Sequence, residues 1–324
     1  MENIFNIFRV KYWWSHVIPP ILVFVYIFSH LNNLTFYSTL FLFALFMLSI
    51  IGTASYGYLL NDISDIKDDN KASKTNYVSK LKNKIRFILL GSTIIIAFIP
   101  WIWLPIGLEN FSLFVFQIFL LTIYSIKPIR LKKHIYLGIL IDALYSNIIF
   151  ILLVILTINS LSDVLIKNHF LLIAGIFSWG LFKGIRNILL HQIDDYENDI
   201  RANNQTYVNK HNLQFAKKTI YITTTIEIFS FFCVLFFISE HFLFIYLLFP
   251  LFIISKLFLQ SIFKIKYNFT KVFYDFLNNY YEEWMPIIIL IYLSFYNQWF
   301  LILLSIHLIL FDNICKQLII KLFK

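Results

Sequence analysis

The sequence predicts an all-α integral membrane protein, built as a bundle of nine, or ten, transmembrane helices. Two observations predict this fold class. Of the 324 residues, 59% are hydrophobic and only 14% are charged, whereas a soluble domain carries about 25% charged residues. The apolar residues also gather into runs that match the roughly 20 residues needed to cross a bilayer. The polar stretches are short, so we expect a single membrane-embedded domain over residues 1–324.

The apolar runs give the expected spans in chain order. Eight of them lie at 15–33, 36–60, 85–104, 109–126, 135–158, 169–192, 218–238 and 241–261. The remainder, 277–322, holds one long span or two short ones. The polar break at Asn297–Gln298–Trp299 and the basic tail favour two short spans. The first 14 residues are too polar for the apolar core of a signal peptide, so no cleavable signal is expected.

The net charge of +9 follows the membrane topology. The loops after the second, fourth, sixth and eighth runs are rich in Lys and Arg, whereas the loops between them contain almost none. This alternation is the positive-inside pattern and predicts a cytoplasmic N-terminus. We expect the protein in the inner membrane of a bacterial cell. The basic charge therefore indicates contact with a lipid bilayer and no nucleic-acid partner.

Two polar loops form an internal repeat with an offset of 130 residues, around residues 61–80 and 191–210. Seven of sixteen aligned positions match, one of them conservatively, and Asp65 and Asp69 align with Asp195 and Asp199. Because four spans separate the two segments, both are expected on the cytoplasmic side.

The first acidic segment, Asn61 to Asp69, ends the second span. On a helix, Asn61, Asp65 and Asp69 lie four residues apart and share a face, with Asp62 at its edge. Carboxylates on one face repel each other, so the face needs a positive partner. Mg²⁺ fits, because it takes hard oxygen ligands and is usually shared between one or two carboxylates and substrate phosphates.

The second acidic segment repeats this spacing at the end of the sixth span, where Asp195 and Asp199 lie four residues apart. Two such faces at one membrane boundary predict Mg²⁺ ions held around a diphosphate. Metal-bound diphosphate is a good leaving group, because the ions neutralise the charge that develops as the carbon–oxygen bond breaks. The apolar surroundings indicate that the rest of the substrate is hydrocarbon.

A third segment, Tyr124-Ser125-Ile126-Lys127-Pro128-Ile129-Arg130-Leu131-Lys132, closes the fourth span. Together with Asn-Asp-x-x-Asp-x-x-x-Asp at 61–69 and Asp-x-x-x-Asp at 195–199, in this order, it resembles the UbiA superfamily of intramembrane prenyltransferases. The Arg-Pro pair that many members carry after the first acidic motif is absent, since residues 74–78 read Lys-Thr-Asn-Tyr-Val. This departure argues against the quinone-forming branches.

The resemblance implies a helical bundle with a central cavity, capped by the cytoplasmic loops. It implies a prenyl diphosphate donor and an acceptor, aromatic or lipid, that the sequence does not identify. The implied Mg²⁺ ligands are Asn61, Asp65, Asp195 and Asp199, supported by Asp62 and Asp69. The implied diphosphate contacts are Tyr124, Lys127 and Arg130. Lys132 and Lys133 more often serve topology in such a loop.

Ionisable residues inside spans are further candidates, because charge within a membrane is costly and usually functional. Lys183 and Arg186 lie one to two turns before His191 and could reach the same diphosphate. Asp142 either forms a structural ion pair or orients the acceptor, and Glu227 has no evident partner. The polar and aromatic segment 275–284 is either a helix on the surface or part of an acceptor site.

Magnesium-dependent prenyl transfer is the leading hypothesis for the activity. Two alternatives remain open. Some relatives transfer a phosphoribosyl group from a sugar diphosphate to a polyprenyl phosphate, and the acidic motifs would bind that diphosphate equally well. The other alternative is a secondary transporter with acidic cation sites. Transporter sites lie near the bilayer midplane, whereas these acidic motifs lie at the ends of spans.

Overall fold

We describe the protein from a computed structural model, which covers residues 2–71, 74–161, 169–201, 205–239 and 277–311, with Ile254 and Tyr274. Every regular element in these residues is helical. In chain order the α-helices are α1 (Glu2–Ile7), α2 (Val10–Trp13), α3 (Ile18–Leu31), α4 (Phe36–Lys71), α5 (Asn83–Phe98), α6 (Leu108–Ser125), α7 (Ile135–Ala143), α8 (Ile149–Asn159), α9 (His169–Asp194), α10 (Tyr196–Arg201), α11 (Tyr207–His211), α12 (Leu213–Ser239), α15 (Met285–Tyr296) and α16 (Phe300–Phe311). Short 3₁₀ helices are η1 (Tyr77–Lys80), η2 (Ile99–Ile102) and η3 (Leu131–Lys133), and π-helical turns are η4 (Leu144–Ile148) and η6 (Tyr280–Trp284).

Six of the described helical stretches are long and apolar enough to cross a membrane: 36–71, 83–102, 108–125, 135–159, 170–194 and 213–238. Two shorter apolar helices, α3 and α16, add to them. Large apolar side chains such as Phe87 and Phe229 are exposed on the outside of the bundle, as lipid-facing residues are. The chain is therefore a multi-pass integral membrane protein.

The number of spans stays a prediction. The expected span at 241–261 falls almost entirely outside the described residues. In the C-terminal part, the break predicted at Asn297–Gln298–Trp299 separates α15 from α16. The polar segment 275–284 does not form a surface helix over its described residues, because Tyr280, Tyr281 and Glu282 are buried in η6.

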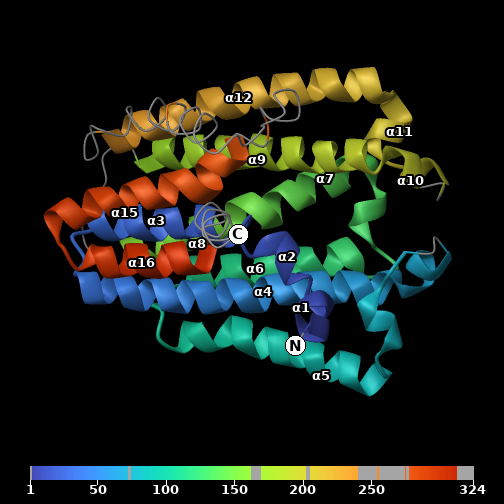
Figure 1. The fold of residues 1–324 in the computed structure, drawn as a ribbon, viewed down its shortest axis with the longest axis horizontal. Coiled ribbons are helices and arrows are strands. Elements are labelled where there is room, and N and C mark those ends of the chain that lie inside the picture. Colours follow the sequence, from blue (N-terminus) through green and yellow to red (C-terminus); the bar gives the residue numbers. More distant parts are fainter. Residues whose placement is uncertain are drawn as a thin grey trace, which may run out of the picture.

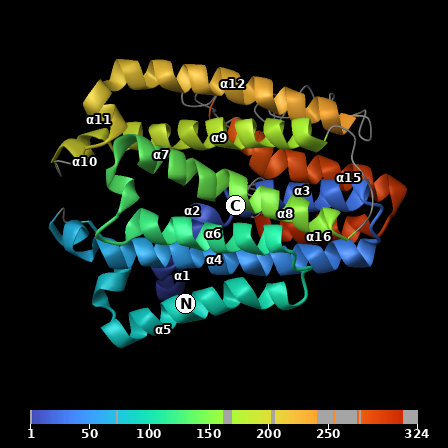
Figure 2. The same cartoon turned by 180° about the vertical axis from the view of Figure 1, so that it is seen from behind.

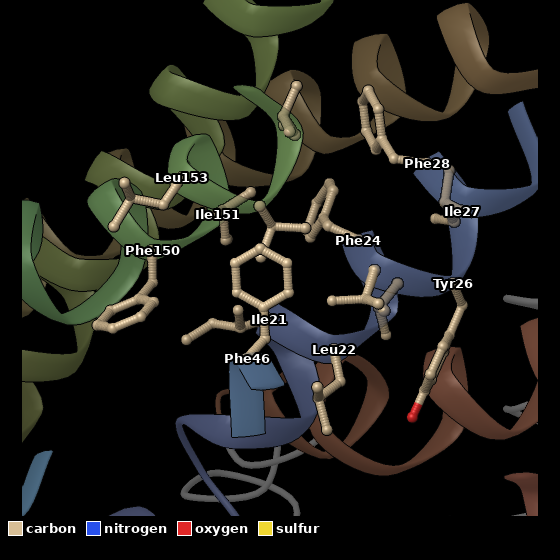
Figure 3. Packing of buried hydrophobic residues seen from close by; sticks show 14 of the residues in the cluster. Ile21, Leu22, Phe24, Tyr26, Ile27, Phe28, Phe46, Phe150, Ile151 and Leu153 are labelled. Atoms are coloured by element: carbon tan, nitrogen blue, oxygen red, sulfur yellow. The ribbon is translucent and has the colours of Figure 1, made fainter. Parts of the chain in front are cut away.

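Helix α3 lies at the centre of the bundle. It begins with Pro19 and Pro20 in its first turn, where a missing amide hydrogen costs nothing. Thirteen of its fourteen residues are buried, which suits a helix that is apolar on all sides. Figure 3 shows Phe24 of α3 beside Phe46 of α4 and Ile151 of α8.

The remaining helices surround α3 in a flattened bundle. Helices α9 and α12 pack together along one side, and α4 and α5 along the other, with α3, α6, α7, α8, α15 and α16 between them (Figures 1 and 2). The C-terminal ends of α4 and α9 and the connection from α6 to α7 lie at the same end of the bundle (Figure 1). The two acidic segments and the basic segment thus lie at one end of the bundle, while the repeat itself stays a prediction.

Candidate functional site

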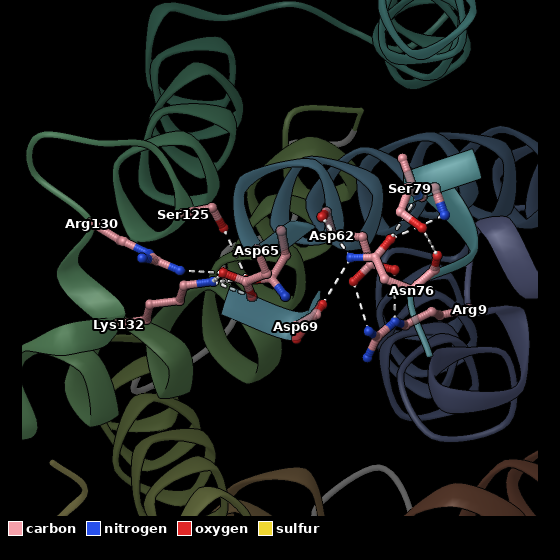
Figure 4. A network of polar contacts seen from close by, with 11 residues as sticks. Arg9, Asp62, Asp65, Asp69, Asn76, Ser79, Ser125, Arg130 and Lys132 are labelled. Atoms are coloured by element: carbon pink, nitrogen blue, oxygen red, sulfur yellow. Dashed lines mark hydrogen bonds and ion pairs between the residues drawn. The ribbon is translucent and has the colours of Figure 1, made fainter. Parts of the chain in front are cut away.

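The last turns of α4 carry an oxygen cluster that holds a positive charge. The Lys132 ammonium, from η3, donates to Asn61 Oδ1 at 2.6 Å and to both carboxylate oxygens of Asp65 at 2.6 Å. Asn61 and Asp65 lie four residues apart on one helix face, so their side-chain oxygens converge on the same point. Figure 4 shows Lys132 and Arg130 reaching this face together.

Arg130 adds a second cation to the same carboxylate. Its guanidinium donates to Asp65 and, at 2.7 Å, to Asp68 Oδ2, and the residue is only 4% exposed. Burial alone would lower the pKa of Arg130, but hydrogen bonds and charge attraction from Asp68 and Asp65 raise it above its usual value. Burial lowers the pKa of Lys132, against the attraction of Asp65. Arg130 also has φ of +44°, a costly conformation for this residue type that is frequent at functional sites.

The other side of α4 is bound to the N-terminal segment and to η1. Arg9 donates to Asp62 Oδ2 at 2.9 Å. The side-chain amide of Asn76 donates from Nδ2 to the Asp62 carbonyl oxygen at 2.9 Å and to Asp69 Oδ2 at 2.8 Å. The structure thus brings Asn61 and Asp65 together and places Asp62 and Asp69 around Asn76 and Arg9 (Figure 4). This arrangement suits Asp62 and Asp69 as residues that position the end of α4.

The segment after α6 lies against the first acidic motif. Ser125 Oγ donates to Asn61 Oδ1 at 3.4 Å, which places Tyr124 within one residue of the oxygen cluster. Lys127 is exposed, within electrostatic range of Asp68. Its expected contact with a diphosphate stays a prediction.

The second acidic motif lies at the junction of α9 and α10. Asp195 forms the turn between the two helices, and the Asp199 amide donates to the Asp195 carbonyl at 2.9 Å, so the four-residue spacing remains helical. Asp195 is exposed, and Asp199 is 8% exposed. Gln192 Oε1 accepts a hydrogen bond from the Tyr207 amide at 3.1 Å, which holds α11 against this end of α9.

Lys183 and Arg186 lie in a buried network deeper along α9. Arg186 forms a bidentate ion pair with Glu227 at 2.6 and 2.9 Å, both side chains being 0% exposed. It also donates to Asn278 Oδ1 at 2.8 Å. The Lys183 ammonium lies 5.7 and 5.5 Å from the ring centroids of Trp179 and Tyr281. The contact of Lys183 and Arg186 with a diphosphate stays a prediction, and the Arg186 guanidinium is already bound to Glu227.

Three parts of the site did not follow from the sequence. The sequence favours a topological role for Lys132, whereas its ammonium lies on Asp65. The partnership of Arg9 with Asp62 and that of Glu227 with Arg186 were also missed. The available signal for the second pair was opposite charge on two apolar spans, since a membrane-buried charge requires a partner.

The donor atoms near Asp65 suit Mg²⁺. One amide oxygen and two carboxylate oxygens already converge on a single positive group, and hard oxygen atoms are the ligands that Mg²⁺ prefers. Within the described residues, no group of three or more His, Cys, Asp or Glu side chains is close enough to hold a metal ion. A site of this kind needs further oxygens from water and from a phosphorylated substrate, which is the usual way Mg²⁺ is bound.

Residues 17–279 match the UbiA prenyltransferase family. Similar solved structures include a UbiA homologue from Archaeoglobus fulgidus bound to GPP and Mg²⁺ (13% identity, TM-score 0.60, 89% of this chain and 99% of that chain). The same homologue bound to DMAPP and Mg²⁺ has 14% identity and a TM-score of 0.53, over 74% of this chain and 85% of that chain. A digeranylgeranylglyceryl phosphate synthase has 17% identity and a TM-score of 0.52, over 93% and 98% of the two chains. No curated protein matches the sequence.

Proposed function

The chain belongs to the UbiA prenyltransferase family, and we propose that it transfers a prenyl group from a prenyl diphosphate to an acceptor within the membrane, with Mg²⁺ as cofactor. The observation that carries the proposal is the cluster of Asn61, Asp65, Arg130 and Lys132, in which metal-type oxygen ligands and phosphate-type cations are assembled together. The homologue from Archaeoglobus fulgidus, bound to GPP and Mg²⁺, supports the choice of donor and metal.

Asn61, Asp65, Asp195 and Asp199 would hold the metal. Bound Mg²⁺ supplies neutralisation of the charge that develops on the leaving diphosphate. Lys132 and Arg130 bind and orient the same diphosphate, one as a compact point charge and the other as a planar fork. Both cations lie on Asp65 in the structure, so they are at hand to exchange that carboxylate for the diphosphate when Mg²⁺ binds Asp65.

Two chemical classes of acceptor fit this proposal. A relative that is a digeranylgeranylglyceryl phosphate synthase supports a lipid acceptor as one possibility, and an aromatic acceptor is the other. Both share a need for a nucleophilic atom at the ionising carbon.

The proposal is tested with purified chain in lipid nanodiscs and geranyl diphosphate, with methanol as a small acceptor probe. We expect Mg²⁺-dependent release of diphosphate, reduced about 10²- to 10³-fold in Asp65→Asn and in Asp195→Asn, since each loses a charge that acts on the leaving group. The matched control is Glu197→Gln, which removes an exposed carboxylate from the first turn of α10, two residues after Asp195, and should keep the wild-type rate. Wild-type rates and unaltered Mg²⁺ dependence in both Asp variants would refute the assignment.

A further inference from the structure

The fifth span contains a π-helical turn, η4, between α7 and α8. Such turns are rare, and they are found frequently at functional sites. Two glycines of α9 pack against it. A Cβ atom at Gly184 would lie 2.6 Å from the Ala143 Cα atom, and one at Gly180 would lie 2.9 Å from Ile148 Cγ1. The glycines thus allow the bulged helix to lie against α9.

A carboxyl group inside the bundle, that of Asp142 near the end of α7, lies two residues before the turn. The Tyr145 hydroxyl donates to Asp142 Oδ1, and Ser146 Oγ donates to the Asp142 carbonyl oxygen at 2.6 Å. Asp142 and Tyr145 are half-buried, although both lie within a membrane-spanning stretch. Among the described residues, no Lys, Arg or His forms an ion pair with Asp142. Within these residues the ion pair that is one of the two roles considered for Asp142 is not formed, although His191 lies within electrostatic range of Asp142.

The Asp142–Tyr145 pair lies beside the diphosphate site. The Tyr145 and Tyr124 rings are in edge contact, with centroids 5.2 Å apart. Tyr124 precedes Ser125, whose hydroxyl donates to Asn61, and it lies in electrostatic range of both Asp142 and Asp65. Tyr124 thus links this pair to the segment that reaches the oxygen cluster on α4. A group at this distance can reach a nucleophile that attacks the carbon released from the diphosphate.

We propose that Asp142, acting through the Tyr145 hydroxyl, accepts the proton of an un-ionised hydroxyl group on the acceptor. In this step the O–H bond of the acceptor and the carbon–oxygen bond of the prenyl diphosphate break, and a new carbon–oxygen bond forms. Tyr145 takes the acceptor proton as it passes its own to Asp142, and the electron pair of the broken carbon–oxygen bond leaves with the diphosphate. The inference rests on the proposed function and narrows the acceptor to an alcohol or a phenol. General-base assistance of this kind contributes about 10²- to 10⁴-fold.

Two readings of geranyl diphosphate turnover separate this role from a structural one. With methanol as the acceptor probe, the amount of geranyl methyl ether reports trapping of the prenyl cation by the acceptor. With donor labelled by ¹⁸O at the bridging position, migration of the label to non-bridging positions reports ionisation of the donor followed by return of the cation to the diphosphate. We expect Asp142→Asn and Tyr145→Phe to lower ether formation about 100-fold and to keep label migration near the wild-type rate, because the donor site is intact.

A matched control removes another buried tyrosine hydroxyl. Tyr26 is hydrogen-bonded to His307 at 3.0 Å in the apolar core, so Tyr26→Phe should leave both readings unchanged. Formate should restore ether formation to Asp142→Ala by supplying the missing carboxylate.

Equal ether formation in wild type and Asp142→Asn would overturn the inference. An equal loss of trapping and label migration in Asp142→Asn, without rescue of Asp142→Ala by formate, would also overturn it, since a structural defect affects both readings. Failure of the wild-type protein to release diphosphate or migrate label would instead refute the proposed donor chemistry, and the inference with it.

Discussion

Asp65 and Asp195 stand at matching positions of the two acidic segments, 130 residues apart, but their surroundings differ. Asp65 is 18% exposed in its side chain and accepts hydrogen bonds from Lys132 and Arg130. Asp195 is exposed, and its carboxylate has no hydrogen-bond or ion-pair partner among the described residues. The cause is the segment after α6, which reaches the end of α4.

This difference separates two kinds of charge compensation. The first segment is preassembled, because the chain supplies both carboxylate and cations before any ligand binds. The second contributes an exposed negative charge that a metal ion and its substrate would neutralise. Changes in the first segment should therefore affect both stability and activity, whereas a change at Asp195 should affect activity alone.

The largest expected effect is on activity, from loss of a cation in the first segment. Lys132→Met removes the ammonium that contacts Asn61 and Asp65, and we expect release of diphosphate from geranyl diphosphate to fall about 10²- to 10³-fold, because charge stabilisation of the leaving group is lost. Lys133→Met is the matched control. The Lys133 side chain is 63% exposed and lies 3.9 Å from Asp68, so its loss should change the rate less than about twofold.

Similar rates for the two lysine variants would contradict the comparison. They would mean that the basic segment acts only through its total charge, and that the position of Lys132 on Asp65 is unimportant.

The roles of Lys132 and Lys133 show where sequence reasoning ended. Composition and apolar runs were sufficient for the helical membrane fold, and motif spacing was sufficient to pair Asn61 with Asp65. Neighbouring lysines in a basic loop look equivalent in sequence. The direction of each side chain depends on the backbone at Arg130, whose positive φ turns the chain into η3. Such a turn has no sequence signal here, because the usual residues for it are Gly and Asn.

The π-helical turn was likewise hidden. Asp142 stands out in the sequence as an ionisable residue in an apolar run, but periodicity does not reveal one extra residue in a helical turn. The contact depends on Gly180 and Gly184 in another helix, so it is a property of packing between spans. The first acidic motif also divides between two sets of partners. Asp62 bonds to Arg9 and Asp69 bonds to Asn76, and both partners lie outside α4, so the motif's spacing along the helix does not reveal them.

The second prediction concerns stability in the absence of Mg²⁺. Asp65→Asn removes the charge that compensates the buried Arg130 and the ammonium of Lys132. We expect this change to lower the free energy of unfolding by about 1–3 kcal/mol. Asp195→Asn should alter it by less than about 0.5 kcal/mol, since it is an exposed change without a lost partner. Thermal unfolding in nanodiscs, with EDTA present, measures both. An equal loss of stability would show that Asp195 also has compensating cations.

The smallest expected effect is a pH dependence of the contacts made by the N-terminal segment, which joins the first acidic segment to the C-terminal helices. Arg9 binds Asp62, and His16 Nδ1 lies 2.7 Å from Glu282 Oε2. The hydrogen bond to Glu282 raises the pKa of His16 above 6.5, against burial; Glu283 adds to the increase and Lys183 opposes it. Because the pKa is raised on folding, this stabilisation is fully present below pH 6.5 and is lost as the pH rises through the folded-state value. We expect the unfolding temperature of wild type to fall slightly across that range, and His16→Gln to remove this part of the slope. If the slope persists in His16→Gln but disappears in Asp195→Asn, the pH-sensitive contact belongs to the second acidic segment and the comparison must be reversed.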